Sequence, residues 1–437
     1  MDPTISVLLA ANILVPAIAT YKSCVSQGLE VNHVAIFTFG YLFYWILPIA
    51  VGASQLLSYL PSAKPFYDLF DQVPSSILST YLLISLCFYL SFVIGHVMSR
   101  GLRLRIVEKW AGLQFNSRLL AIYLLLGVAA YAVYAYLLRD QLFKGYNVSF
   151  AEFADPLRGT FAAWCNFLEC VALIYTVTIE FKLRHTAKFA RVVINRYMLV
   201  AAVALLLDLS IGQRHFTLTF AAMLLLYRSV FFERLHLGSA LLLFVVGLGA
   251  AGGFALMRQQ YLDFTLLEII CAEPMFTSLA LCFYLREAIF PLIRFPFLLF
   301  EDLIFILPTM FFPDKLSLVP SVSDAGIPLF NPLGTVHSFL SFMANFGVFG
   351  SLGVLFLFGF VLNILKSCSR VPLLRVIYIL LSGQLAFSFW RDDFAMSLKN
   401  ILEFSILIPI FIYASSNALS GLSRHKQLRM MGRLFNT

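Results

Sequence analysis

The feature that most constrains this chain is a succession of apolar runs, joined by short polar connections, that continues along most of its 437 residues. About 20 apolar residues cover the hydrocarbon core of a bilayer. We identify about eleven such runs and predict a transmembrane helix from each. They lie near residues 5–20, 34–59, 76–99, 118–138, 159–180, 193–212, 216–232, 236–257, 338–365, 372–390 and 399–418. Only 12% of the residues are charged, about half the usual proportion in soluble domains, so we predict an all-α integral membrane protein with residues 1–437 in a single polytopic domain.

The distribution of lysine and arginine predicts how the runs are oriented. With the basic C-terminal segment placed in the cytoplasm, the cytoplasmic connections hold 20 of these residues and the outer ones 11. This excess follows the positive-inside rule for eleven spans with the N-terminus outside and the C-terminus in the cytoplasm. It also accounts for the net charge of +8, so the charge does not indicate a nucleic-acid partner.

The succession of spans is interrupted once, between Arg258 and His337, after the eighth predicted span and before the ninth. Residues 258–337 are rich in Phe, Leu and Ile, but they also contain charged side chains and eight prolines. We predict a large outer segment of short amphipathic helices, one or two in residues 265–290 and a similar arrangement in residues 291–312. Such a segment lies on the membrane surface or folds over a cavity, and we expect the functional site there.

Three polar segments fall on the predicted outer side, at residues 212–215, 331–337 and 390–393. Arg214 and Arg391 occupy two of the short turns. A guanidinium group is a planar fork of donors that matches phosphate oxygens and stays charged, so these arginines are suited to hold a lipid pyrophosphate at the interface. Alternatively they anchor the helices or form ion pairs, Arg391 with Asp392 or Asp393.

The same segments contain candidates for proton transfer. His337 could act as a general base or donate a hydrogen bond to phosphate, or it could simply cap a helix. Glu273 and Asp393 are the main carboxylate candidates for the base, and the sequence does not decide between them. Further substrate-binding candidates are His215, Arg258, Arg286, Asn331 and Asp392. No metal-ligand, phosphate-loop or dinucleotide motif is present, so we expect neither a metal nor a cofactor.

Two patterns lie within the predicted spans. Glu169, Glu180 and Asp208 are acidic residues at membrane depth, and such residues usually face the bundle interior and have a partner. Glycines recur at three-residue spacing through residues 347–353, which places them on nearly one face of a helix. Small residues allow close approach of helices in lipid, so we predict that this face packs against a neighbouring helix.

Several motifs of residues 205–400 occur in a characteristic order. After the arginine of the short turn come Glu-Pro at 273–274, Pro-Thr-Met-Phe-Phe-Pro at 308–313, Asn-Pro-Leu-Gly-Thr-Val-His at 331–337, Phe-Met-Ala-Asn-Phe-Gly-Val-Phe-Gly at 342–350 and Trp-Arg-Asp-Asp-Phe at 390–394. In order and spacing this region resembles the Wzy family of bacterial O-antigen and related oligosaccharide repeat-unit polymerases. The first 200 residues match only in hydropathy. Gln213 and His215 depart from the small residues that are frequent beside the family's arginine.

The resemblance implies a multispanning glycosyltransferase of the GT-C type in the bacterial inner membrane, with its site facing the periplasm. Its donor and acceptor would be undecaprenyl-pyrophosphate-linked oligosaccharides, and a chain-length regulator and a flippase would act in the same pathway. It also implies that Arg214 and Arg391 bind the pyrophosphate. Alternatives are an O-antigen ligase, a transporter or flippase of lipid-linked oligosaccharides, and a membrane O-acyltransferase using His96 or His337.

Overall fold

A computed structural model describes most of the chain. The described residues are 2–25, 30–60, 63–102, 114–142, 156–183, 188–211, 214–233, 265–287, 291–296, 338–391 and 398–418, with short stretches between 238 and 253. Within them, every regular element is a helix. These are α1 (Pro3–Val25), α2 (His33–Tyr41), η1 (Leu42–Ile46), α3 (Leu47–Ser54), α4 (Lys64–Phe70), α5 (Ser75–Met98), α7 (Ser117–Leu137), α9 (Pro156–Lys182), α10 (Phe189–Val193), α11 (Arg196–Ser210), α12 (Arg214–Phe231), α14 (Leu266–Glu287), α17 (Ser338–Ser367), α18 (Pro372–Gln384), α19 (Ser388–Arg391) and η4 (Ile401–Leu407).

Seven helices of the described part are long and apolar enough to cross a membrane. They are Pro3–Val25, His33–Ser54, Ser75–Met98, Ser117–Leu137, Leu157–Lys182, Phe339–Ser367 and Leu398–Ala418. Each coincides with one of the eleven predicted spans. Two further predicted spans correspond to the shorter apolar helices His215–Phe231 and Pro372–Gln384. The helices are therefore compatible with an integral membrane protein, while the predicted count of eleven is not confirmed.

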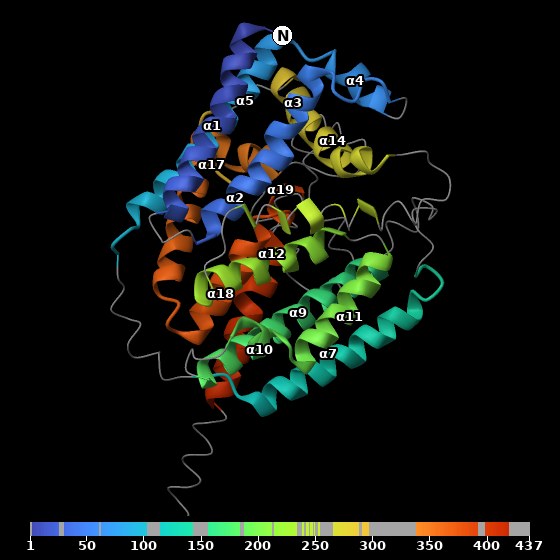
Figure 1. The fold of residues 1–437 in the computed structure, drawn as a ribbon, viewed down its shortest axis with the longest axis vertical. Helices are drawn as coiled ribbons and strands as arrows, with labels where there is room; N and C mark the ends of the chain where they lie inside the picture. Colours follow the sequence, from blue (N-terminus) through green and yellow to red (C-terminus); the bar gives the residue numbers. More distant parts are fainter. Residues whose placement is uncertain are drawn as a thin grey trace, which may run out of the picture.

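The helices form two groups with a pair between them (Figure 1). On one flank α7 and α11 pack against α9, and on the other α1 and α17 pack against α5. The pair α12 and α18 joins the groups, since α18 contacts both α9 and α2. Side chains on the outer face of α7, such as Leu125 and Leu126, are exposed, as expected of a surface that faces lipid.

Helices α5 and α17 approach each other closely. A Cβ atom added to Gly95 would lie 2.0 Å from the carbonyl oxygen of Phe356, and one added to Gly359 would lie 2.1 Å from that of Phe92. Only glycine fits at both positions, so the two backbones are nearly in contact. A hydrogen bond also joins the two helices, because the hydroxyl of Ser91 in α5 donates to the carbonyl oxygen of Leu352 in α17 at 2.6 Å.

The prediction that the glycines of residues 347–353 form one packing face is not confirmed among the described residues. Gly347 has a φ of 71°, which interrupts the helical backbone of α17. A Cβ on Gly353 would meet no described atom within 4 Å, and one on Gly350 would meet only Phe346 of the same helix. Glycine spacing alone cannot distinguish a packing face from a break, because the residue permits both.

The prediction for residues 265–290 also needs correction. The described residues there form one long helix, Leu266–Glu287 (α14), packed against α3, α5 and α17, instead of one or two short helices. Thr265 and Glu268 form a reciprocal capping box at its start: Oε2 of Glu268 accepts from the Thr265 amide at 2.6 Å, and Oγ1 of Thr265 accepts from the Glu268 amide at 3.3 Å. Leu279 and Cys282 are fully buried. Of the similar arrangement predicted for residues 291–312, residues 291–296 are described and contain no helix.

Candidate functional site

The helices that carry the two predicted phosphate-binding arginines meet at one end of the α12–α18 pair. Phe231 of α12 contacts Tyr378 of α18, with ring centroids 6.2 Å apart. Further along, a Cβ on Gly383 would lie 2.1 Å from Cγ of Met223. From the first contact to the second, the residue number decreases in α12 (231 to 223) and increases in α18 (378 to 383). The two helices are therefore antiparallel. The short helix α19 follows α18 and also contacts α12.

This antiparallel arrangement gives the pair two distinct ends. The first, which we call the arginine end, is formed by the start of α12 at Arg214 and by α19, which ends at Arg391. The second, which we call the histidine end, lies around Phe231, Arg375 and Tyr378. The sequence placed the two arginines in turns 177 residues apart (391 minus 214), and the fold brings their helix termini to the same end.

The arginine end rests on a buried cluster of aromatic rings. The indole of Trp390, the residue before Arg391, is fully buried, and its Nε1 donates to the carbonyl oxygen of Leu385 at 2.5 Å. Its ring is stacked on that of Phe339, with centroids 5.5 Å apart. Phe339 is the second residue of α17, so this contact fixes α19 against the start of that helix. Trp45, in the π-helical turn η1, contacts both rings.

The predicted site residues fall into three groups. Arg214, Glu273 and Arg391 lie in α12, α14 and α19. His215 and Arg286 each contact an aromatic ring of their own helix: the His215 ring is 3.9 Å from that of Phe216, and the Arg286 guanidinium lies 4.6 Å from the ring of Phe283. The others lie outside the described residues, namely Arg258, Asn331, His337, Asp392 and Asp393.

The break in α17 is held by a second segment that the sequence did not pair with it. The two amides that follow the interruption take part: Val348 donates to the carbonyl oxygen of Pro291 at 3.2 Å, and Phe349 donates to that of Leu292 at 2.9 Å. In return, the Arg294 amide donates to the carbonyl oxygen of Phe346 at 3.0 Å. Residues 291–294 thus supply the partners that a continuous helix would have supplied itself. Non-helical backbone at membrane depth is tolerated where protein covers it in this way.

Arg294 also affects a phenol of α14. Burial raises the pKa of Tyr284, and the positive charge of Arg294 acts in the opposite direction. The interaction places a cationic residue of the 291–296 segment near α14. Residues 291–294, which belong to the predicted outer segment, are hydrogen-bonded to α17.

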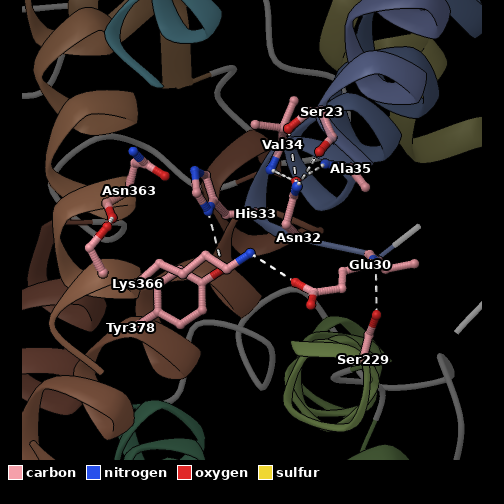
Figure 2. Close-up of polar contacts among 12 residues, drawn as sticks. Ser23, Glu30, Asn32, His33, Val34, Ala35, Ser229, Asn363, Lys366 and Tyr378 are labelled. Carbon is pink, nitrogen blue, oxygen red and sulfur yellow. Dashed lines mark hydrogen bonds and ion pairs between the residues drawn. The ribbon is translucent and has the colours of Figure 1, made fainter. Parts of the chain in front are cut away.

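The histidine end contains a hydrogen-bonded chain whose direction can be deduced. Nη2 of Arg100 lies 3.1 Å from Nε2 of His96, and a guanidinium only donates, so this nitrogen accepts. Nδ1 of His96 then donates to Nε2 of His33 at 2.9 Å, and Nδ1 of His33 donates to the hydroxyl of Tyr378 at 3.1 Å. Both imidazoles are neutral in this arrangement. Figure 2 shows His33 directed at Tyr378.

Other polar contacts tie the neighbouring helix ends together around this chain. Lys366 of α17 forms an ion pair of 3.2 Å with Glu30, as Figure 2 shows. Asn32 caps α2 by accepting from the amides of Val34 and Ala35, and its Nδ2 donates to Oγ of Ser23 in α1 at 3.0 Å. Together with the histidine chain, these contacts join α1, α2, α5, α17 and α18. We therefore interpret them as stabilising the fold.

A buried ion pair completes the histidine end. The carboxylate of Glu180 in α9 contacts the guanidinium of Arg375 in α18. The hydroxyl of Tyr227 in α12 donates to the other oxygen of the same carboxylate at 2.7 Å. The Arg375 guanidinium also lies over the rings of Phe181 and Phe231, 4.4 and 4.3 Å from their centroids. The prediction that Glu180 has an interior partner is confirmed.

No family model, curated protein or solved structure matches the chain. The sequence motifs and the geometry of the two ends are thus the basis for assigning a function. Of the two, the histidine end has its charged groups in mutual contact, as in a structural network. The arginine end is where the helix termini at Arg214 and Arg391 lie.

Proposed function

We propose that this protein is a repeat-unit polymerase that joins undecaprenyl-pyrophosphate-linked oligosaccharides at the periplasmic face of a bacterial inner membrane. The observation that supports this best is the meeting of α12 and α19 at the arginine end, with the start of α17 fixed beside them by Trp390 and Phe339. Under this proposal the C-terminus is cytoplasmic and the histidine end faces the cytoplasm.

The reaction needs no nucleotide, because the donor already carries a good leaving group. A hydroxyl of the acceptor's non-reducing sugar attacks the anomeric carbon of the growing glycan. The new glycosidic C–O bond forms as the bond to the pyrophosphate oxygen breaks, and the electron pair leaves with the lipid pyrophosphate. Arg214 and Arg391 stabilise this charge. A base takes the hydroxyl proton, and the candidates remain Glu273, His337, Asp392 and Asp393.

Two arginines suit this task better than lysines. The leaving pyrophosphate presents several oxygens, and each guanidinium can donate two parallel hydrogen bonds to them. Arg391 directly follows Trp390, whose ring is buried, so the backbone that carries this arginine is firmly held. Preorganised donors of this kind lose little on reorganisation during the reaction.

The test is the surface-glycan ladder of a deletion strain complemented with variants. Arg214→Ala and Arg391→Ala should abolish long polymer while single repeat units still reach the cell surface, and Arg→Lys at either position should restore polymer only in part. Arg196→Ala is a matched control, because Arg196 starts α11 as Arg214 starts α12, and its guanidinium lies over Tyr197 of its own helix. It should give a normal ladder.

The same experiment separates the alternatives. Loss of a polymerase leaves lipopolysaccharide with one repeat unit, whereas loss of a ligase leaves none. Loss of a flippase leaves repeat units inside the cell. Normal ladders in both arginine variants at wild-type protein levels would exclude the proposed role of the arginine end.

A further inference from the structure

Two acidic residues lie inside the bundle, away from both ends of the α12–α18 pair. Glu169 of α9 is 4% exposed and Asp208 of α11 is 0% exposed. Their helices pack together, and Tyr175 of α9 is stacked on Tyr197 of α11, with ring centroids 3.7 Å apart. Glu169 lies about two turns before Tyr175 and Asp208 about three turns after Tyr197. The thiol of Cys165 donates to Oε1 of Glu169 at 3.6 Å. The prediction that acids at this depth face the interior is confirmed here too.

In the part of the chain that the structure describes, no lysine or arginine forms an ion pair with either acid. Among the described residues, the hydrogen-bond partner of the Glu169 carboxyl group is the thiol of Cys165. Both carboxyl oxygens of Asp208 are buried and have no hydrogen-bond partner within the described part of the chain. Tyr131 of α7 does not fill this need, because its hydroxyl donates to the carbonyl oxygen of Ala204 at 2.7 Å, one turn before Asp208.

Two ionised carboxylates cannot remain side by side in such a place, because each loses its hydration and they repel one another. A single proton on either group removes one of the two charges. A metal ion would need more ligands, and the described residues contain no group of three or more His, Cys, Asp or Glu suited to hold one.

We propose that Glu169 and Asp208 form a proton-binding site between α9 and α11, in which the two carboxyl groups hold at least one proton at neutral pH. The site does not depend on the proposed polymerase activity. Glu180, eleven residues further along α9 (180 minus 169), is its natural counterpart, because Arg375 compensates its charge and it needs no proton.

Infrared spectroscopy of the full-length protein in an ester-free detergent tests the proposal. A protonated carboxylic acid has a C=O stretch well separated from the carboxylate bands. We expect this band at neutral pH in the wild type, its loss in Asp208→Asn, and its loss or shift in Glu169→Gln. Glu180→Gln is the matched control on the same helix and should leave the band unchanged. A wild type without a band sensitive to either substitution would overturn the proposal.

A second measurement needs no variant. A hydrophobic carbodiimide reacts with a protonated carboxyl group: the acid proton goes to a carbodiimide nitrogen, and the carboxyl oxygen bonds to the central carbon. Peptide mass spectrometry should find the adduct at Glu169 or Asp208 and not at Glu180. Adduct on Glu180 alone would count against the site. If added sodium removes both the infrared band and the adduct, the pair binds a sodium ion and the assignment to a proton is wrong.

Discussion

The two ends of the α12–α18 pair use arginine in opposite ways. At the histidine end, Arg375 is buried against Glu180 and two aromatic rings, so its charge is compensated within the protein. At the arginine end, Arg214 and Arg391 occupy helix termini that meet around a buried aromatic support. We therefore expect variants at the histidine end to change stability, and variants at the arginine end to change activity at normal stability.

The largest loss of stability should come from Arg375→Ala. Removing one partner of a buried ion pair leaves the other charge uncompensated, which costs about 3–5 kcal/mol. Glu180 would keep only the hydroxyl of Tyr227 among the contacts described above, and Phe181 and Phe231 would lose their cation. Unfolding in mixed micelles, followed by loss of helical circular dichroism, measures the change.

A double variant sharpens this prediction. Arg375→Met with Glu180→Gln removes both charges while keeping similar volumes, and replacing both partners of a buried pair is often close to neutral. We expect it to recover most of the stability lost in Arg375→Ala. Equal losses in the single and double variants would show that packing, not the uncompensated carboxylate, dominates at this end.

The sequence predicted the elements whose signals are local. Hydropathy located seven helices of membrane-spanning length, because a long apolar run is sufficient evidence for one. It did not predict α14 as one long helix, because Glu268 and Pro274 interrupt the apolar pattern of the segment. The capping box of Thr265 and Glu268 was the signal that would have indicated a helix start there.

Contacts between distant residues left no comparable trace. His33 and His96 are isolated histidines in two apolar runs, and only the fold brings their rings together. The break at Gly347 depends on a positive φ and on backbone hydrogen bonds with residues 291–294. Neither can be inferred from a glycine in an apolar run. The proposed site lies between these two cases. The motifs indicated Arg214 and Arg391, but they did not indicate the antiparallel packing of α12 and α18 that brings the two helix termini to one end.

An intermediate loss of stability is expected from Gly359→Ala. Its Cβ would lie 2.1 Å from the carbonyl oxygen of Phe92, so α5 and α17 must separate, at a cost of about 1–3 kcal/mol. Gly353→Ala is the matched control on the same helix, because its Cβ would meet no described atom within 4 Å. The control should be neutral or stabilising by up to about 1 kcal/mol. Similar losses at both positions would contradict the close contact.

The smallest effect is expected from Asn32→Ala, which tests whether the histidine end is one network or a set of separate contacts. Loss of a helix cap alone costs about 1 kcal/mol. Asn116→Ala is the control, because Asn116 also caps a helix, α7, through the amide of Arg118 at 2.9 Å. Asn32 is buried and donates to Ser23 as well, so its loss leaves a buried hydroxyl with one contact fewer. A larger loss of stability for Asn32→Ala than for Asn116→Ala supports a coupled network. Equal losses would mean that the contacts at the histidine end contribute to stability independently.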